Sequence, residues 1–332
     1  MSNTYYIGWD VGAWNCPSPK FAAQSQDCIT VLDDKEKLIW AWMGNVSSKI
    51  CGSFLDFING LATDKADNII VKKEDKIIVA IDASLGLPQN AVTIANLGDT
   101  ATQVPAVIEQ KDLSRANNPM IYRYTEQWID KNVFDNKGNP PLSAIQNQIG
   151  SQATKALYAL KRMGFTWNNT EYIWSTENIK AIETYPTACK KIIGQKVEQL
   201  AKQLHTLIIV NDKIQFTMND FLMQENQFQS HDNYVVHYKN DSICWWLTPA
   251  PQKHPERKKS ERYIMQYSDL FDSAICALTA KEYKNGSVNT PENLNFSPGE
   301  KDRIASEGWI WIPWPKENTT ENSSCPTPSK TN

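Results

Sequence analysis

Continuous apolar runs that end in a carboxylate dominate the hydrophobic pattern of this chain. The run 77–81 (Ile-Ile-Val-Ala-Ile) leads into Asp82, and the run 5–9 (Tyr-Tyr-Ile-Gly-Trp) leads into Asp10. A run without polar alternation is typical of a strand buried on both faces, as at the centre of an α/β sheet. Because open α/β folds bind ligands at the carboxyl edge of the sheet, the pattern predicts one shared site at these strand ends.

The first eighty or so residues predict a specific order of elements. In order, these are strands at 4–11, 28–32 and 38–42, a helix within 47–62 and the strand that ends at Asp82. A three-stranded meander, a crossover helix and a returning strand form the start of the ribonuclease-H-like fold. A right-handed crossover places the fourth strand beside the first, so Asp10 and Asp82 are expected to lie together.

The rest of the chain is expected to complete a single α/β domain over residues 1–315. The further elements are helices near 104–115 and 120–131, a helix at 143–163 that stops at Gly164, a strand at 179–184, a helix from about 188, strands near 207–210 and 234–237, a helix at 263–278 and a strand at 308–313. Residues 90–142 and 205–250 are interpreted as insertions. The polar tail 316–332 is expected to be disordered.

Composition narrows the class of protein. With 332 residues, 41% of them hydrophobic, the chain can bury a large core. The net charge of -3 argues against a surface coated in positive charge for indiscriminate DNA binding, although it is compatible with a local basic groove. Seven cysteines without a CxxC pair indicate reduced thiols. With no signal-peptide pattern and no apolar run of the roughly 18 residues that a membrane span needs, we expect a soluble cytoplasmic protein.

Three further carboxylates are candidates for the same site. Glu183 ends a strand, and Asp269 and Asp272 share one face of a helix. Converging carboxylates raise each other's pKa unless divalent cations neutralise them. Hard oxygen ligands without a His or Cys cluster favour Mg²⁺ or Mn²⁺ over zinc, and a pair of such ions can drive phosphodiester cleavage. The candidate catalytic residues are Asp10, Asp82, Glu183 and Asp272, and the candidate metal ligands are Asp10, Asp82, Asp269 and Asp272.

Basic residues near this set are candidate phosphate contacts. The stretch 253–262 holds five basic and two acidic residues, and we expect its Lys258 and Arg262, together with Arg123, to bind substrate phosphates. The alternative for the stretch is a solvated loop. The alternative for Arg123 is a surface ion pair of little energetic weight with Glu126, one helical turn away.

Two accessory candidates and one alternative complete the site. Glu126 is an accessory candidate, and His254 is either a proton shuttle or, more simply, a loop residue. Glu183 precedes Tyr-Pro, so it could instead cap the following helix or pair with Lys190.

Several of these segments together resemble one family. They are Tyr-Ile-Gly-Trp-Asp-Val-Gly (6–12), Ala-Ile-Asp-Ala-Ser-Leu-Gly-Leu-Pro (80–88), Arg-Tyr-Thr-Glu (123–126), Ile-Gly-Ser-Gln-Ala (149–153), Ile-Glu-Thr-Tyr-Pro (182–186) and Asp-Leu-Phe-Asp-Ser-Ala (269–274). The set is similar to the predicted ribonuclease-H-like nucleases catalogued as domain of unknown function 429, over about residues 5 to 313. Where that family has Asp-Ala-Pro this chain has Asp-Ala-Ser, and where it has a late Asp-Ala this chain has Asp-Ser. The resemblance implies the ribonuclease-H-like fold and a nuclease, a hydrolase acting on DNA or RNA.

Two other functions fit parts of the pattern. An ATP-binding phosphotransferase of the actin and sugar-kinase type also begins with a strand ending in Asp-x-Gly. Such proteins need glycine-rich loops around the phosphates, whereas this chain has 14 Gly, no Gly-Gly pair and the bulky Ala-Trp-Asn after Gly12. A non-catalytic module that binds nucleic acid or protein would keep the fold, but carboxylates without a metal to bind would destabilise it. The sequence does not identify any protein partner, so whether one exists is left open.

Overall fold

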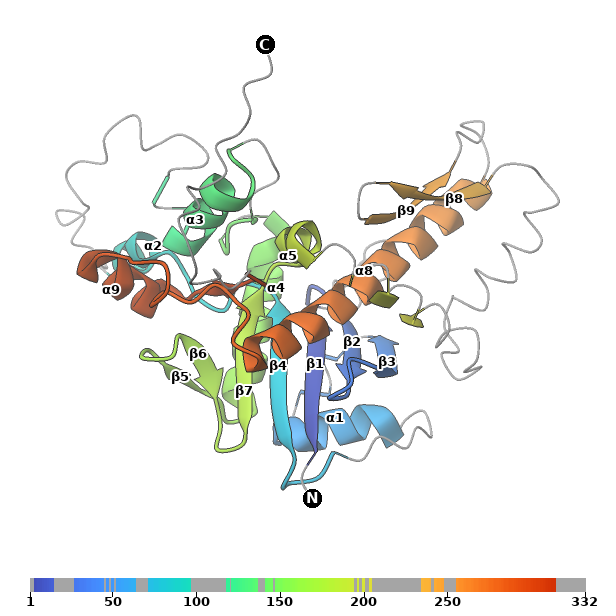
Figure 1. Cartoon of the computed structure of the whole chain (residues 1–332), viewed down its shortest axis with the longest axis horizontal. Helices are drawn as coiled ribbons and strands as arrows, with labels where there is room; N and C mark the ends of the chain where they lie inside the picture. The colour runs from blue at the N-terminus through green and yellow to red at the C-terminus, as the bar shows by residue number, and fades with distance from the viewer. Residues whose placement is uncertain are drawn as a thin grey trace, which may run out of the picture.

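In the computed structural model the described residues are 3–14, 27–63 (without 45, 48 and 51), 71–96, 118–136 (without 120), 141–193 (without 146), 196, 199–200, 203–204, 234–239, 242–247 and 255–314. For 43, 63, 93–96, 147–149, 234–239, 242–247 and 255–268, only the backbone is described. Together these residues form a mixed α/β fold in which helices flank an open sheet (Figure 1).

An eight-stranded mixed sheet forms the centre of the fold. Its order is β3 (Leu38–Gly44), β2 (Asp27–Leu32), β1 (Thr4–Asp10), β4 (Lys76–Asp82), β7 (Ile179–Thr184), β6 (Ile173–Ser175) and β5 (Thr166–Asn168), and β10 (Ile310–Trp311) also pairs with β7. β1, β4, β7 and β10 are parallel to their partners in this group, while the remaining pairs are antiparallel. The three central strands therefore end at the same edge of the sheet.

Helices cover both faces of this sheet. They are α1 (Phe54–Thr63), α2 (Gln89–Asn96), α3 (Tyr124–Val133), α4 (Asn147–Arg162), α5 (Pro186–Ile193), α8 (Pro255–Lys284) and α9 (Pro298–Glu307). The long helix α8 crosses one face against β1, β2 and β4, and α1 and α4 pack on the other face (Figure 1). A separate antiparallel pair is formed by β8 (Tyr234–Lys239) and β9 (Ser242–Leu247).

Alternate side chains of the central strands supply two hydrophobic cores. Tyr6 and Ile78 pack into the core on the α8 side, whereas Ile7 and Val79 pack into the core with α1 and α4. Because both faces are covered, both sets of alternate positions must be apolar. The unbroken apolar runs of β1 and β4 follow from this two-sided burial.

The contact between α8 and β1 depends on Gly8. A Cβ atom placed on Gly8 would lie 1.7 Å from the carbonyl oxygen of Ser273 and 2.5 Å from the backbone nitrogen of Ala277. Any side chain at position 8 would therefore push α8 away from the strand. Since Asp269 and Asp272 lie on the adjoining turn of α8, Gly8 also sets how closely they approach the ends of the strands.

The predicted β-β-β-α-β order is confirmed. β1 and β4 pair in parallel, and Asp10 lies opposite Asp82 in their register. The helix expected within 47–62 begins later, at Phe54, because Ser53 caps it: the N–H of Asp56 donates to the Ser53 hydroxyl, and the Asp56 carboxylate accepts the Ser53 N–H. The strand expected near 234–237 is confirmed as β8.

Other predicted bounds differ from the structure or lie outside it. The helix expected at 263–278 is α8, which begins at Pro255, so the basic stretch from 255 onward is helical and the solvated-loop alternative is wrong for it. The pattern did not predict β5, β6, β9, α2 or α9. The elements expected at 104–115 and 207–210 and the tail lie outside the described residues. No helix within the described ranges is long and apolar enough to cross a membrane.

Candidate functional site

Two aspartates stand side by side at the carboxyl edge of the sheet. Asp10 is the last residue of β1 and Asp82 the last residue of β4, and the two are paired in the parallel register. Both are half-buried. Each aspartate directly follows a continuous apolar run. The parallel pairing aligns the two runs residue by residue, so the two aspartates lie next to each other.

Helix α8 brings two more aspartates to this edge. Asp269 and Asp272 are half-buried, and Asp272 forms an ion pair with Lys190 of α5. The side chains of Asp272 and Lys190 are 21% and 19% exposed. The Lys190 ammonium also lies 5.3 Å from the centre of the Phe271 ring. The site thus combines two strand ends, one helix face and one lysine from a second helix.

The four aspartates repel one another. Burial raises the pKa of Asp10 well above its usual value, and Asp82, then Asp269 and Asp272, raise it further. The pKa of Asp82 is raised well above its usual value by burial and by Asp272, although Lys190 acts in the opposite direction. Burial, followed by Asp272, raises the pKa of Asp269 to about 7. The negative charge of this set is therefore only partly compensated.

Lys190 is the cation that opposes this charge. Burial alone would lower the pKa of its ammonium, but Asp272, followed by Asp82 and Asp10, raises it above the usual value. Burial raises the pKa of Asp272, and Lys190 lowers it. Among the described side chains, one positive charge thus faces four carboxyl groups. This is the arrangement in which additional cations are stabilised by Coulomb attraction.

The chemistry of the donor atoms fits a hard divalent cation. The neighbouring thiols of Cys28 and Cys276 have their pKa raised well above the usual value by burial, so they stay protonated and are poor ligands. Carboxylate oxygens remain as donors, and these suit Mg²⁺ or Mn²⁺. Among the described residues, no group of three or more His, Cys, Asp or Glu side chains is placed so that it could hold a metal ion. Asp272 is already paired with Lys190, so a bound ion would compete with this ammonium group for the Asp272 carboxylate.

Glu183 is placed at the same edge but is already fully engaged. Its Oε2 accepts a hydrogen bond from Arg123 Nη1 at 2.8 Å and another from the Leu85 N–H at 2.8 Å, and its Oε1 accepts from Arg123 Nη2. Glu183 is 5% exposed and Arg123 is fully buried. This geometry does not support the predicted catalytic role of Glu183. The alternative of a pair with Lys190 is wrong, because the partner is Arg123.

Arg123 is equally unsuited to the predicted contact with substrate phosphates. Its Nε donates to Glu126 Oε1 at 2.9 Å, and its remaining nitrogens bind Glu183 and the carbonyl of Glu307. The expected pair with Glu126 is present, but it is buried on both sides rather than on the surface. Burial raises the pKa of Glu126 to about 7, although Arg123 acts in the opposite direction. Glu126 is therefore buried with both of its carboxylate oxygens bound to Arg123, and this geometry does not support an accessory role in the site.

Sequence analysis missed a second buried ion pair at this edge. Asp27, the first residue of β2, pairs with Lys155 of α4, and both side chains are fully buried. Asp27 also accepts hydrogen bonds from Trp9 Nε1, Gly12 N and Val46 N, each at 3.1 Å. Lys155 lies off the apolar stripe of its helix, so nothing in the helical pattern marks it as buried. Its ammonium also donates to the Ala13 carbonyl, in the loop that follows β1.

The loop after β1 is held by the chain's own side chains. The N–H of Gly12 donates to Asp27, and the N–H of Trp14 donates to the Ser151 hydroxyl at 3.1 Å. The Trp14 indole N–H donates to Thr154, and its ring packs against Tyr158 with 5.6 Å between ring centres. These backbone N–H groups are therefore not free to cradle a phosphate.

The predicted basic residues are described only in part. Lys258 and Arg262 lie in the first turns of α8, with the backbone alone described, and His254 lies outside the described residues. Positions 258, 262 and 269 are spaced by four and seven residues, which places them on one face of the helix. Arg262 precedes Asp269 by two turns, roughly 10 Å along the axis.

Comparison with protein-family models, with curated proteins and with solved structures finds no match to this chain. The resemblance to the ribonuclease-H-like nuclease family therefore stays a prediction. The site itself, with its four aspartates and one lysine, is the basis for a functional proposal.

Proposed function

We propose that this protein is a divalent-metal-dependent nuclease that hydrolyses phosphodiester bonds of DNA or RNA at the carboxyl edge of its sheet. The observation that carries the proposal is the pairing of Asp10 with Asp82 at adjacent strand ends, facing Asp269 and Asp272. Four carboxylates that share one lysine gain most from bound divalent cations. A fold that only needed stability would do better with apolar side chains at these positions.

We further propose that the sheet is of the ribonuclease-H-like type. The strand order β3-β2-β1-β4-β7, with β1 to β3 as an antiparallel meander and β4 parallel to β1, supports this assignment. The predicted family resemblance points the same way. Cys28, Cys189 and Cys276 are buried free thiols, which agrees with the expected reduced state.

Each residue of the site would have a distinct role. Asp10 and Asp82, fixed by the sheet, would bind Mg²⁺ or Mn²⁺, and Asp269 and Asp272 would complete the oxygen ligands. When bound, a pair of such ions activates a water for attack on phosphorus and stabilises the departing sugar oxygen. The first turns of α8 would meet the nucleic acid backbone, because Lys258 and Arg262 share a helix face with Asp269.

An ATP-dependent phosphotransferase is less well supported. That function needs backbone N–H groups free to surround the phosphates after the first strand. Here the N–H groups of Gly12 and Trp14 are bound by Asp27 and Ser151. A non-catalytic binding module gives no reason for the crowding of the four aspartates.

The test is cleavage of labelled single-stranded, duplex, hybrid and branched nucleic acids with Mg²⁺, Mn²⁺ or EDTA. We expect metal-dependent cutting that Asp82→Asn lowers at least about a hundredfold, because the substitution removes a metal ligand. Asp302→Asn, at an exposed position of α9, is the matched control and should cut like the unaltered protein.

The outcomes separate the alternatives. Cutting by Asp82→Asn at the normal rate would refute the proposal. If nothing is cut, but Mn²⁺ raises the melting temperature of the unaltered protein and not that of Asp82→Asn, the metal site stands and the substrate is a different phosphoester. If neither cleavage nor stabilisation by Mn²⁺ is seen, the nuclease proposal is wrong and a non-catalytic binding module is the better-supported function.

A further inference from the structure

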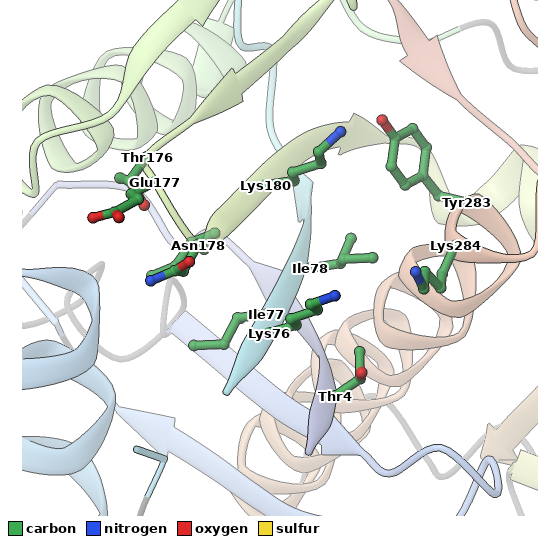
Figure 2. A pocket seen from close by; sticks show the side chains of 11 residues that line it. Thr4, Lys76, Ile77, Ile78, Thr176, Glu177, Asn178, Lys180, Tyr283 and Lys284 are labelled. Atoms are coloured by element: carbon green, nitrogen blue, oxygen red, sulfur yellow. The ribbon is translucent and has the colours of Figure 1, made fainter. Parts of the chain in front are cut away.

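A second candidate site lies at the opposite edge of the sheet. A hollow of about 470 Å³ opens at the amino ends of β1, β4 and β7, beside the last turn of α8 (Figure 2). Its volume is within the range of small-molecule sites. Because the strands run between the two edges, this hollow is separated from the aspartates by the length of β4. It is independent of the proposed nuclease chemistry.

The rim of the hollow is positively charged. Lys76 of β4, Lys180 of β7 and Lys284 of α8 line it, and Glu177 is the one carboxylate among the lining residues. Lys180 forms an ion pair with Glu171, with 2.8 Å between the charged atoms. Within the described chain, Lys76 and Lys284 have no ion-pair partner. Figure 2 shows these two lysines on opposite sides of the hollow, so a bound anion would lie between them.

The inner surface offers an apolar side chain, an aromatic ring and several neutral hydrogen-bond donors. Ile78 is nearly fully buried and forms the apolar part of its floor, whereas the side chains of Ile77 and Ile179 pack into the core on the other face of the sheet. The Tyr283 ring is fixed edge-on against Trp311, with 5.0 Å between ring centres. Burial raises the pKa of Tyr283 to about 12, so its hydroxyl is protonated and can donate to an anion. A fixed aromatic ring beside an apolar floor accommodates a flat apolar group.

We infer that this hollow binds a small ligand that joins a flat apolar body to a phosphate group, as a mononucleotide does. The phosphate would lie between Lys76 and Lys284, and the Tyr283 hydroxyl, which Figure 2 shows turned toward Lys180 and away from these two lysines, would donate to another part of the ligand. The base would lie against Ile78 and the Tyr283 ring. Neither part of the hollow alone gives much affinity, since the lysines are exposed and screened by salt, but the two together select an amphipathic anion.

The experiment is titration calorimetry with AMP, adenosine and inorganic phosphate, in EDTA and low salt so that no metal binds at the aspartates. We expect AMP to bind more tightly than either fragment, and its affinity to fall with added salt. The double variant Lys76→Gln/Lys284→Gln should weaken AMP binding by about tenfold or more, because two charges that attract the phosphate are removed. Lys131→Gln/Lys161→Gln removes the same charge at exposed positions and should bind AMP normally.

Two further results decide the inference. Asp82→Asn should bind AMP like the unaltered protein, which separates this hollow from the nuclease site. Absence of AMP binding at millimolar concentration, or AMP binding that is unchanged in Lys76→Gln/Lys284→Gln, overturns the inference. Equal melting temperatures of the two double variants would exclude unfolding as the cause of any loss.

Discussion

The carboxyl edge of the sheet holds two kinds of buried carboxylate. Glu183 and Asp27 each have a fully buried cation of their own, Arg123 and Lys155, and their oxygens accept further hydrogen bonds from backbone or indole N–H groups. The four aspartates of the candidate site share one lysine. All of these carboxylates lie at or beside strand ends or on a helix packed against the sheet, so position does not distinguish them.

The difference lies in how the negative charge is compensated. For a carboxylate with its own cation and a complete set of hydrogen bonds, these interactions offset the free-energy cost of removing the charge from water. At Asp27 burial raises the pKa and Lys155 lowers it, whereas at Asp10, Asp82 and Asp269 burial and neighbouring aspartates both raise the pKa, so the four aspartates are not compensated in this way. The first kind of carboxylate holds the fold together, and the second leaves a charge for a ligand to neutralise. The following substitutions test this division.

The largest effect is expected at Arg123. Arg123→Met leaves Glu183 and Glu126 buried without their cation, and we expect it to lower the free energy of unfolding by about 3–5 kcal/mol in urea denaturation. Arg162→Met, at an exposed position of α4, should change it by less than about 0.5 kcal/mol. The double variant Arg123→Met/Glu183→Gln should recover part of the loss, since one stranded charge is gone. A loss as small as that of Arg162→Met would mean that the buried pair is not structural.

A smaller effect of a different kind is expected at Lys190. In EDTA, Lys190→Met should lower the free energy of unfolding by about 1–2 kcal/mol, because Asp272 loses its partner. Mn²⁺ should then raise the melting temperature of Lys190→Met by more than that of the unaltered protein, since the ion no longer competes with an ammonium group. Lys161→Met is the exposed control. Equal responses to Mn²⁺ would show that Lys190 does not compete for the aspartates.

The sequence predicted the part of this site that follows from strand pairing. Continuous apolar runs located β1 and β4, and the handedness of the crossover placed Asp10 beside Asp82. It could not separate Asp82 from Glu183, because each ends an apolar strand and only a tertiary partner distinguishes them. The partner of Glu183 is Arg123, 60 residues away in the sequence, and no local pattern relates the two.

Other features escaped prediction for local reasons. β5 and β6 are three residues long, too short to show a period of two. The first turns of α8 have no apolar stripe, although Pro255 at the start and the Glu, Lys and Arg that follow are favourable for a helix. Lys155 is buried by the loop after β1 rather than by its own helix. In each case tertiary contacts or propensity outweighed the periodicity used for prediction.

The smallest expected effect is a change in pH dependence at Asp269. Its pKa is raised from 3.8 to about 7 in the folded protein, so between about pH 4 and 7 the folded state holds a proton that the unfolded state has lost. The stability of the metal-free protein must therefore fall as the pH rises through this range.

Asp269→Asn removes the titrating group. In EDTA, the variant should be the more stable of the two, and its advantage should grow from pH 5 to pH 8. Urea denaturation at both values measures this, and Mn²⁺ should reduce the difference at pH 8. Stability curves that run parallel from pH 5 to 8 would mean that Asp269 is compensated like Glu183, and the division between the two kinds of carboxylate would then fail at this residue.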